Sequence, residues 1–156
     1  MKILINSILA LLMFQSCNLM ANSERNLQEM TLSEATSYLN QAKATGNTEI
    51  LIAALSHSDM NIQLYGLTLL GDATKPPPRE AINAMCDVLL KNIKHPIDGS
   101  EFASIQQNLI KNAVRILSRW TKVPATITPN SSQSEVAEFI RKVQTYENRN
   151  EHKQSP

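Results

Sequence analysis

Apolar residues recur at spacings of three and four along most of this chain, which is the period of an α-helix. Each run starts near a residue that caps helix N-termini and stops at glycine, proline or a polar turn. Two starts, Thr31 with Glu34 and Ser132 with Glu135, have the pattern of a capping box. Residues 125–128 have some β propensity, but they are too few for a strand and have no partner segment. The sequence therefore predicts an all-α fold.

Six helices are predicted from these runs. They cover about residues 31–46, 48–56, 59–71, 78–93, 100–121 and 132–147. The fifth is expected to be the longest, and three consecutive prolines at 76–78 form an extended connector before the fourth.

The beginning of the chain has the organisation of an exported protein. Lys2 gives a basic start, and residues 3–14 form an apolar stretch that is too short to span a membrane, which takes about 20 residues. Residues 14–17 resemble a bacterial lipobox, with Ser16 at the small position before Cys17. That resemblance implies a signal peptide over residues 1–16, lipidation of Cys17 and a lipoprotein anchored on the periplasmic side of the cell envelope.

A second cleavage site competes with the lipobox. Residues 21–23 form a small-x-small site for ordinary signal peptidase, and cleavage after Ser23 would give a soluble periplasmic protein. A third interpretation leaves the segment uncleaved as an anchor. With either cleavage, no disulfide can form within the mature monomer, so the domain must rely on its hydrophobic core.

The rest of the chain divides into three parts. Residues 17–30 are mostly polar and are expected to be a tether. Residues 31–147 carry all six predicted helices and form the helical domain. Residues 148–156 contain no apolar side chain and are expected to be a disordered tail.

Residues 49–71 resemble one HEAT-type helical repeat. Such a repeat has a short helix, a polar turn with aspartate and a second helix ending in Leu-Gly, and the matching residues are Ile50, Leu51, Ala54, Leu55, Ser58, Asp59, Ile62, Leu69, Leu70 and Gly71. The chain departs from the repeat at Gln63, where arginine is common, and at Gly66, where alanine is usual. Residues 79–120 fit a second, looser helix pair. The resemblance implies that the six helices stack as antiparallel pairs in a HEAT- or armadillo-like solenoid fragment, which binds partner proteins and carries no chemistry.

Four basic residues form a row on the helix predicted over residues 100–121. Lys111, Arg115, Arg119 and Lys122 are separated by four, four and three, so they lie on one side of the helix, opposite its apolar positions. We call this row the basic stripe. One interpretation is an ordinary solvated face. The other is a docking surface for an acidic protein or for anionic lipid headgroups.

Charge is unevenly distributed on a larger scale as well. The whole chain has a formal net charge of +1, which gives no argument for nucleic-acid binding. Residues 17–90 nevertheless hold four basic and eight acidic side chains, whereas residues 91–156 hold ten and six. The two halves could face each other within the fold or display two poles of opposite charge.

The sequence offers no combination of residues for catalysis or for a metal. His57, His95 and His152 are not paired with one another or with cysteine at ligand spacing, and no serine lies in a Gly-x-Ser-x-Gly turn. Cys86 falls among the apolar residues of a predicted helix and is expected to be a buried core thiol. We therefore expect no metal, no cofactor and no enzymatic activity.

These features predict a protein-binding helical domain in the bacterial cell envelope. A concrete form is an immunity or inhibitor protein that neutralises a toxin or a wall-degrading enzyme by covering its site. The alternative is a structural accessory lipoprotein of an envelope complex. An enzyme is the third interpretation, and no constellation of residues supports it.

Overall fold

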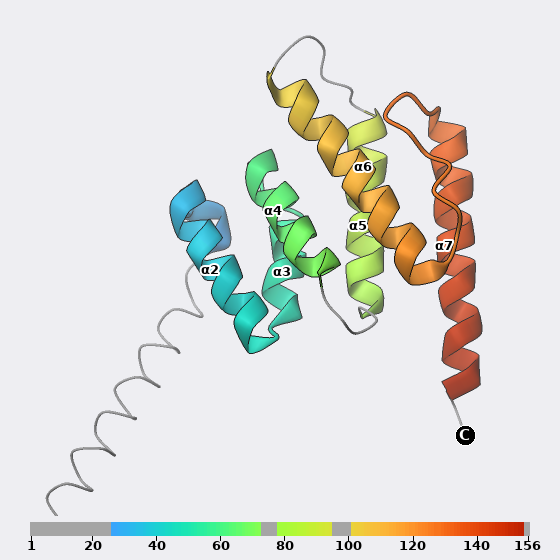
Figure 1. The fold of residues 1–156 in the computed structure, drawn as a ribbon, viewed down its shortest axis with the longest axis horizontal. Coiled ribbons are helices and arrows are strands. Elements are labelled where there is room, and N and C mark those ends of the chain that lie inside the picture. The colour runs from blue at the N-terminus through green and yellow to red at the C-terminus, as the bar shows by residue number, and fades with distance from the viewer. Residues whose placement is uncertain (1–25, 73–77, 95–100, 155–156) are drawn as a thin grey trace, which may run out of the picture. The chain divides into compact units, whose positions relative to one another are not determined.

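The computed structural model describes residues 26–72, 78–94 and 101–154. These segments contain six α-helices, which are α2 (Leu32–Thr45), α3 (Thr48–Ala54), α4 (Met60–Gly71), α5 (Arg79–Lys94), α6 (Glu101–Thr121) and α7 (Gln133–Gln154). Figure 1 shows their arrangement, and none of the three segments contains a strand. The prediction of an all-α fold with six helices is therefore confirmed.

The chain divides into two compact units, Met1–Met30 and Thr31–Pro156. The described end of the first unit is a short 3-10 helix, η1 (Leu27–Glu29), which begins after Asn26. The side-chain oxygen of Asn26 accepts a hydrogen bond from the Gln28 backbone N–H at 3.2 Å. All six α-helices belong to the second unit.

Both predicted capping boxes are present. At α2, the Glu34 backbone N–H donates to the Thr31 hydroxyl at 3.4 Å, and the Thr31 N–H donates to the Glu34 carboxylate at 3.0 Å. At α7, Ser132 and Glu135 make the same reciprocal pair at 3.3 and 2.7 Å. These bonds satisfy N–H groups that have no partner inside the helix, which is why the two helices begin where the sequence indicates.

The six helices share one continuous core. Helices α2, α3 and α4 contact one another, α5, α6 and α7 contact one another, and the packing of α4 on α6 and of α3 on α5 joins the two groups. Each helix from α2 to α7 contributes buried apolar side chains, including Leu39, Leu51, Ile62, Leu67, Met85, Leu89, Leu109, Ile116, Val136 and Val143. Burial of each large apolar side chain stabilises the fold by about 2 kcal/mol.

Two glycines allow α4 to approach its neighbours closely. A Cβ atom on Gly66 would lie 2.6 Å from the Cβ of Ala54 on α3, which is far inside van der Waals contact. A Cβ atom on Gly71 would lie 2.6 Å from the Cδ1 of Ile116 on α6. The departure from alanine at Gly66 therefore has a packing reason in this chain.

Two buried amides donate hydrogen bonds to backbone carbonyls outside their own helices. The Gln63 side-chain amide on α4 donates to the backbone carbonyl of His57, and the His57 Nδ1 in turn accepts from the Asp59 backbone N–H at 2.9 Å. The Gln106 amide on α6 donates to the carbonyl of Asn92 on α5 at 3.1 Å. Both amides lie in the interior, so these bonds offset the cost of removing polar groups from water.

Several details of the fold differ from the sequence-based expectations. Residues 148–156 were predicted to be a disordered tail, but α7 continues to Gln154 because no glycine or proline interrupts residues 133–154. With 22 residues, α7 is also longer than α6, which has 21. The three-and-four spacing of apolar residues puts Phe102 on the core side of α6, yet 57% of its surface is exposed, and the first buried residue of this helix is Gln106. None of the described helices is both long and apolar enough to cross a membrane.

Candidate partner-binding surface

The basic stripe lies on the solvent side of α6. The opposite side of the helix buries Leu109, Ala113, Ile116 and Leu117, in the three-and-four spacing that the sequence predicted. The four stripe residues Lys111, Arg115, Arg119 and Lys122 are all exposed. The helix thus presents cations outward because its core-facing side is occupied by packed aliphatic side chains.

The first half of the stripe has few contacts of its own. The Arg115 guanidinium donates to the Asn112 side-chain oxygen at 3.4 Å. Among the ion pairs between described residues, none involves Lys111 or Arg115. Unlike a charge already paired on the protein surface, these two cations can contact an external anion without first breaking an internal ion pair.

The second half of the stripe also supports the fold. The Arg119 guanidinium donates to the carbonyl of Gly71, the last residue of α4. Lys122 has a positive φ of 59° directly after α6, and its ammonium donates to the Arg119 carbonyl at 3.1 Å. Lysine at a helix C-terminus stabilises the unpaired carbonyls there. Arg119 and Lys122 are therefore exposed cations with structural contacts.

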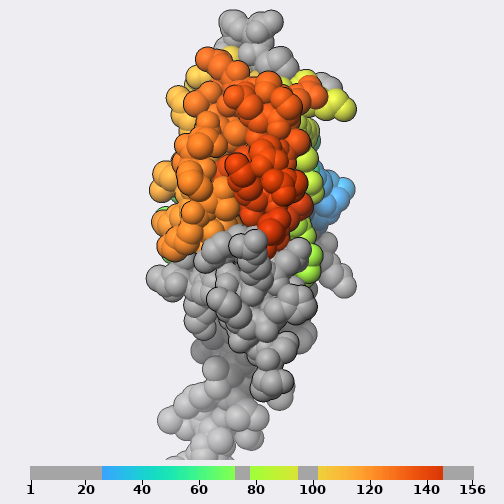
Figure 2. All heavy atoms as spheres, turned by 90° about the vertical axis from the view of Figure 1, so that its right-hand side faces the viewer, coloured from blue at the N-terminus to red at the C-terminus, as the bar shows by residue number. Residues whose placement is uncertain are grey.

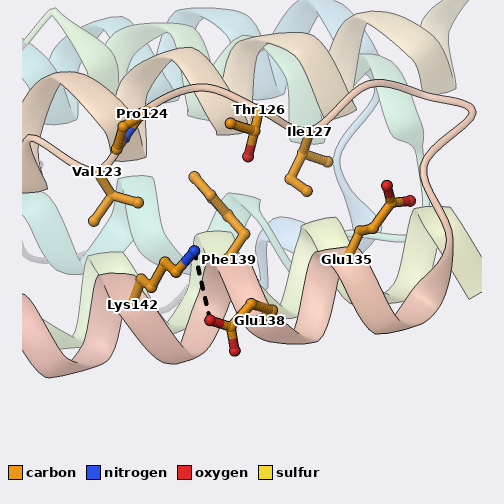
Figure 3. A pocket seen from close by; sticks show the side chains of 8 residues that line it. All are labelled: Val123, Pro124, Thr126, Ile127, Glu135, Glu138, Phe139 and Lys142. Atoms are coloured by element: carbon orange, nitrogen blue, oxygen red, sulfur yellow. Dashed lines mark ion pairs between the residues drawn. The ribbon is translucent and has the colours of Figure 1, made fainter.

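The segment that follows α6 lies along α7. It is held by local bonds, such as Thr126 N–H to the Pro124 carbonyl at 2.9 Å and Ser131 N–H to the Thr128 carbonyl at 3.0 Å. Ile127 is buried, and Figure 3 shows Phe139 pointing from α7 into the space between this segment and the helix. Sequence reasoning found only weak β propensity at residues 125–128 and missed Ile127 as a core residue.

Two open hollows lie on this side of α7 and share Val123, Pro124 and Lys142. The first has a volume of about 200 Å³ and is the one drawn in Figure 3. The second, which we call the cationic groove, has a volume of about 410 Å³ and is lined by Thr121, Lys122, Val123, Pro124, Arg141, Lys142 and Thr145. Three of these seven residues are cations, and none is acidic.

One carboxylate, Glu138, is bound to two of the groove cations. Its oxygens accept hydrogen bonds from Nε and Nη2 of Arg141, both at 2.8 Å, and lie 3.5 Å from the Lys142 ammonium. The hydrogen bonds from Arg141 are the main reason that the pKa of Glu138 falls to about 2, and they also raise the pKa of Arg141. Figure 3 shows the Lys142 side chain extending along α7 toward Glu138, with a dashed line marking the ion pair between them.

The groove joins the basic stripe to α7. Lys122 belongs to both, because it ends the stripe and lines the groove beside Arg141 and Lys142. In Figure 2, the end of α6, the following segment and α7 lie side by side on one face of the helical unit. The cations at the end of α6 and those of α7 thus lie on either side of an uncharged segment, residues 123–132.

Sequence reasoning missed Arg141 and Lys142 as members of this surface. No sequence pattern indicates that the segment after α6 runs along α7, so the proximity of Lys122 to Arg141 and Lys142 could not be predicted. A partial signal existed in the spacing of Glu138, Arg141 and Lys142, which indicates charged neighbours on one helix surface.

The other sequence candidates have different surroundings. Cys86 is buried, as expected, beneath a hollow of about 390 Å³ between α5 and α7. His57 is also buried and accepts a hydrogen bond at Nδ1. Cys17 and His95 lie outside the described residues. In the described part of the chain, no group of three or more histidine, cysteine or acidic side chains could hold a metal ion.

Comparison of the chain with protein-family models, with curated proteins and with solved structures gave no match. The function must therefore be inferred from this surface and from the sequence patterns described above.

Proposed function

We propose that the protein is a non-catalytic protein-binding domain of the bacterial cell envelope, and that it binds its partner through the basic stripe of α6. The observation that carries this proposal is the exposure of Lys111 and Arg115, which no described carboxylate pairs, on a helix whose other side is buried from Gln106 onward. Exposed cations that form no ion pair within the protein attract an acidic partner and speed its association. The resemblance of residues 49–71 to a HEAT-type repeat supports the same function, since stacked helix pairs are common protein-binding scaffolds.

We further propose that the chain is exported and that Cys17 carries a lipid anchor, with cleavage after Ser23 as the alternative that gives a soluble periplasmic protein. The basic and apolar beginning of the sequence and the lipobox-like residues 14–17 support export. Two or more acyl chains attached to a protein hold it stably at a membrane without a spanning helix. The polar residues 17–30 would then serve as the tether between the anchor and the helical domain.

Two partner classes follow from this placement. An immunity or inhibitor protein would cover the active site of one toxin or wall-degrading enzyme, and its affinity would be high because it must prevent all activity. A structural accessory lipoprotein would contact one component of an envelope complex. The cationic surface favours an acidic partner in both cases.

The test is a pull-down from an envelope fraction with the full chain as bait, followed by affinity measurement with the captured protein. We expect the pair Lys111→Glu and Arg115→Glu to lower the affinity at least about tenfold and to reduce its salt dependence. The matched control, Lys91→Glu, changes one exposed lysine on α5 and should change neither. If the two stripe substitutions leave affinity and salt dependence unchanged, the stripe is not the binding surface.

Localisation has its own test. Cys17→Ala should move the protein from the membrane fraction to the soluble fraction, while Cys86→Ala should not. An unchanged distribution of the Cys17→Ala variant would contradict the lipid anchor.

A further inference from the structure

The cationic groove differs from the rest of the positively charged surface because it combines charge with an apolar floor. The groove is lined by Lys122 at the end of α6, by Arg141 and Lys142 on α7, and by the apolar residues Val123 and Pro124. The hydroxyls of Thr121 and Thr145 are already bonded to backbone carbonyls of their own helices, so the polar character of the groove comes from its cations. A ligand that fits must therefore be anionic and must also offer apolar surface.

The cations of the groove are only partly neutralised. Among the residues whose side chains the structure describes, Glu138 is the one carboxylate bonded to Arg141 and Lys142, and it does not line the groove itself. Lys122 donates to a backbone carbonyl and has no ion pair with any described residue. The charge balance therefore favours an additional carboxylate from outside the chain.

We propose that the cationic groove binds an acidic segment of the partner protein, with a carboxylate placed between Lys122 and Lys142 and a neighbouring apolar side chain against Val123 and Pro124. This inference rests on the proposed protein-binding function and names the part of the surface that gives specificity. A hollow between a loop and a helix accepts a protruding polypeptide segment. A flat layer of lipid headgroups would contact only its rim, which favours a protein ligand over a membrane surface.

Glu138 has a defined role in this arrangement. Its two bonds to Arg141 hold the guanidinium in place, and its contact with Lys142 competes with any incoming carboxylate for that ammonium. Removing the negative charge of Glu138 should therefore strengthen the binding of an acidic ligand. An effect in this direction is specific to the groove, because general damage to the fold would weaken binding.

The experiment uses the full chain in neutral detergent and a short fluorescein-labelled peptide of alternating glutamate and leucine, with anisotropy as the readout. We expect the pair Lys122→Glu and Lys142→Glu to lower the peptide affinity at least about tenfold, and Lys142→Gln alone to lower it about threefold. Glu138→Gln should raise it about threefold, whereas Lys91→Glu on α5 should leave it within about twofold. A peptide of alternating glutamine and leucine should bind at least about tenfold more weakly than the acidic one.

Several outcomes would overturn the groove proposal. Equal binding of the glutamine peptide, an equal loss with Lys91→Glu, or weaker binding of Glu138→Gln would each contradict it. So would phosphatidylglycerol vesicles that bind in a Lys142-dependent way while the acidic peptide does not, because the groove would then contact lipid. If the captured partner loses affinity with the stripe substitutions but not with the groove substitutions, the proposed function stands and the groove proposal fails. If neither pair affects the partner, the proposed function fails.

Discussion

Gly66 of α4 lies so close to Ala54 of α3 that a Cβ atom on residue 66 would come within 2.6 Å of the alanine Cβ. Helices α3 and α4 therefore pack with almost no side-chain atoms between them where they cross. Glycine in a helix costs about 1 kcal/mol relative to alanine, so close packing at this point must offset that cost.

Gly66→Ala should destabilise the protein by about 2 kcal/mol, because neither the new methyl group nor Ala54 can move aside without shifting a helix. Gly71→Ala is the matched control. Its new methyl group meets Cδ1 and Cγ1 of Ile116 at 2.6 and 2.9 Å, and the terminal Cδ1 can rotate, so the loss should be smaller than for Gly66→Ala, about 1 kcal/mol. Urea unfolding followed by circular dichroism measures both values. A larger loss for Gly71→Ala than for Gly66→Ala would contradict this account of the crossing.

Ile127→Ala should destabilise the protein by about 2 kcal/mol, since it removes most of a buried side chain from between the segment after α6 and α7. Thr126→Ala changes an exposed neighbour on the same segment and should cost less than about 0.5 kcal/mol. Thermal unfolding distinguishes the two. Equal and small effects would mean that this segment is not part of the folded core.

The pH dependence of Glu138 tests the ion pairs beside the groove. The pKa of this carboxyl is lowered from 4.5 to about 2, so the stabilisation from its charged form is fully present above pH 4.5 and disappears as pH falls from 4.5 toward 2. Carboxyl-carbon NMR of the full chain should show this low midpoint. In Arg141→Met, the main cause of the shift is absent, and the midpoint should move up toward 4.5.

The control for that titration is Lys91→Met, which removes a cation from α5 and should leave the Glu138 midpoint unchanged. A midpoint near 4.5 in the unmodified chain would show that the pair between Glu138 and Arg141 does not form in solution.

Arg119→Met should lower the free energy of unfolding by about 1 kcal/mol, because it removes the hydrogen bond to the Gly71 carbonyl. Arg115→Met removes an equal charge from the same row, but within the described segments the Arg115 guanidinium bonds only to the Asn112 side chain, and the change should be within about 0.5 kcal/mol of zero. Chemical denaturation at two salt concentrations separates the hydrogen bond from general charge effects. Equal losses for the two variants would refute a structural role for Arg119.

The helix boundaries were largely predictable because caps act through residues close together in sequence. The reciprocal bonds at Thr31 and Ser132 depend only on a glutamate three residues later, and both helices begin where the sequence indicates. The exposure of Phe102 was not predictable. Periodicity assigns a side chain to a face of the helix, but it does not reveal where the neighbouring helices stop covering that face.

The candidate site was predictable only in part, for the same reason. The basic stripe lies on one helix and follows from its spacing. The groove brings together Lys122 and residues of α7, so it depends on the path of the chain after α6. The bond from Arg119 to Gly71 likewise joins α6 to α4, which are separated by α5 in the sequence, and no local sequence pattern predicts it.

The hydrogen bond from Arg119 to the Gly71 carbonyl gives this residue a role in the fold in addition to its proposed role in partner binding. A guanidinium has several N–H donors spread over three nitrogens, so Arg119 can bond to the Gly71 carbonyl and also donate to a carboxylate of the partner. A lysine would have to make both contacts through one ammonium nitrogen. Mutations that adapt the protein to a new partner are therefore expected at Lys111 and Arg115, where the folded state does not constrain the choice. Arginine at 119 should persist through such changes, because replacing it alters recognition and folding together.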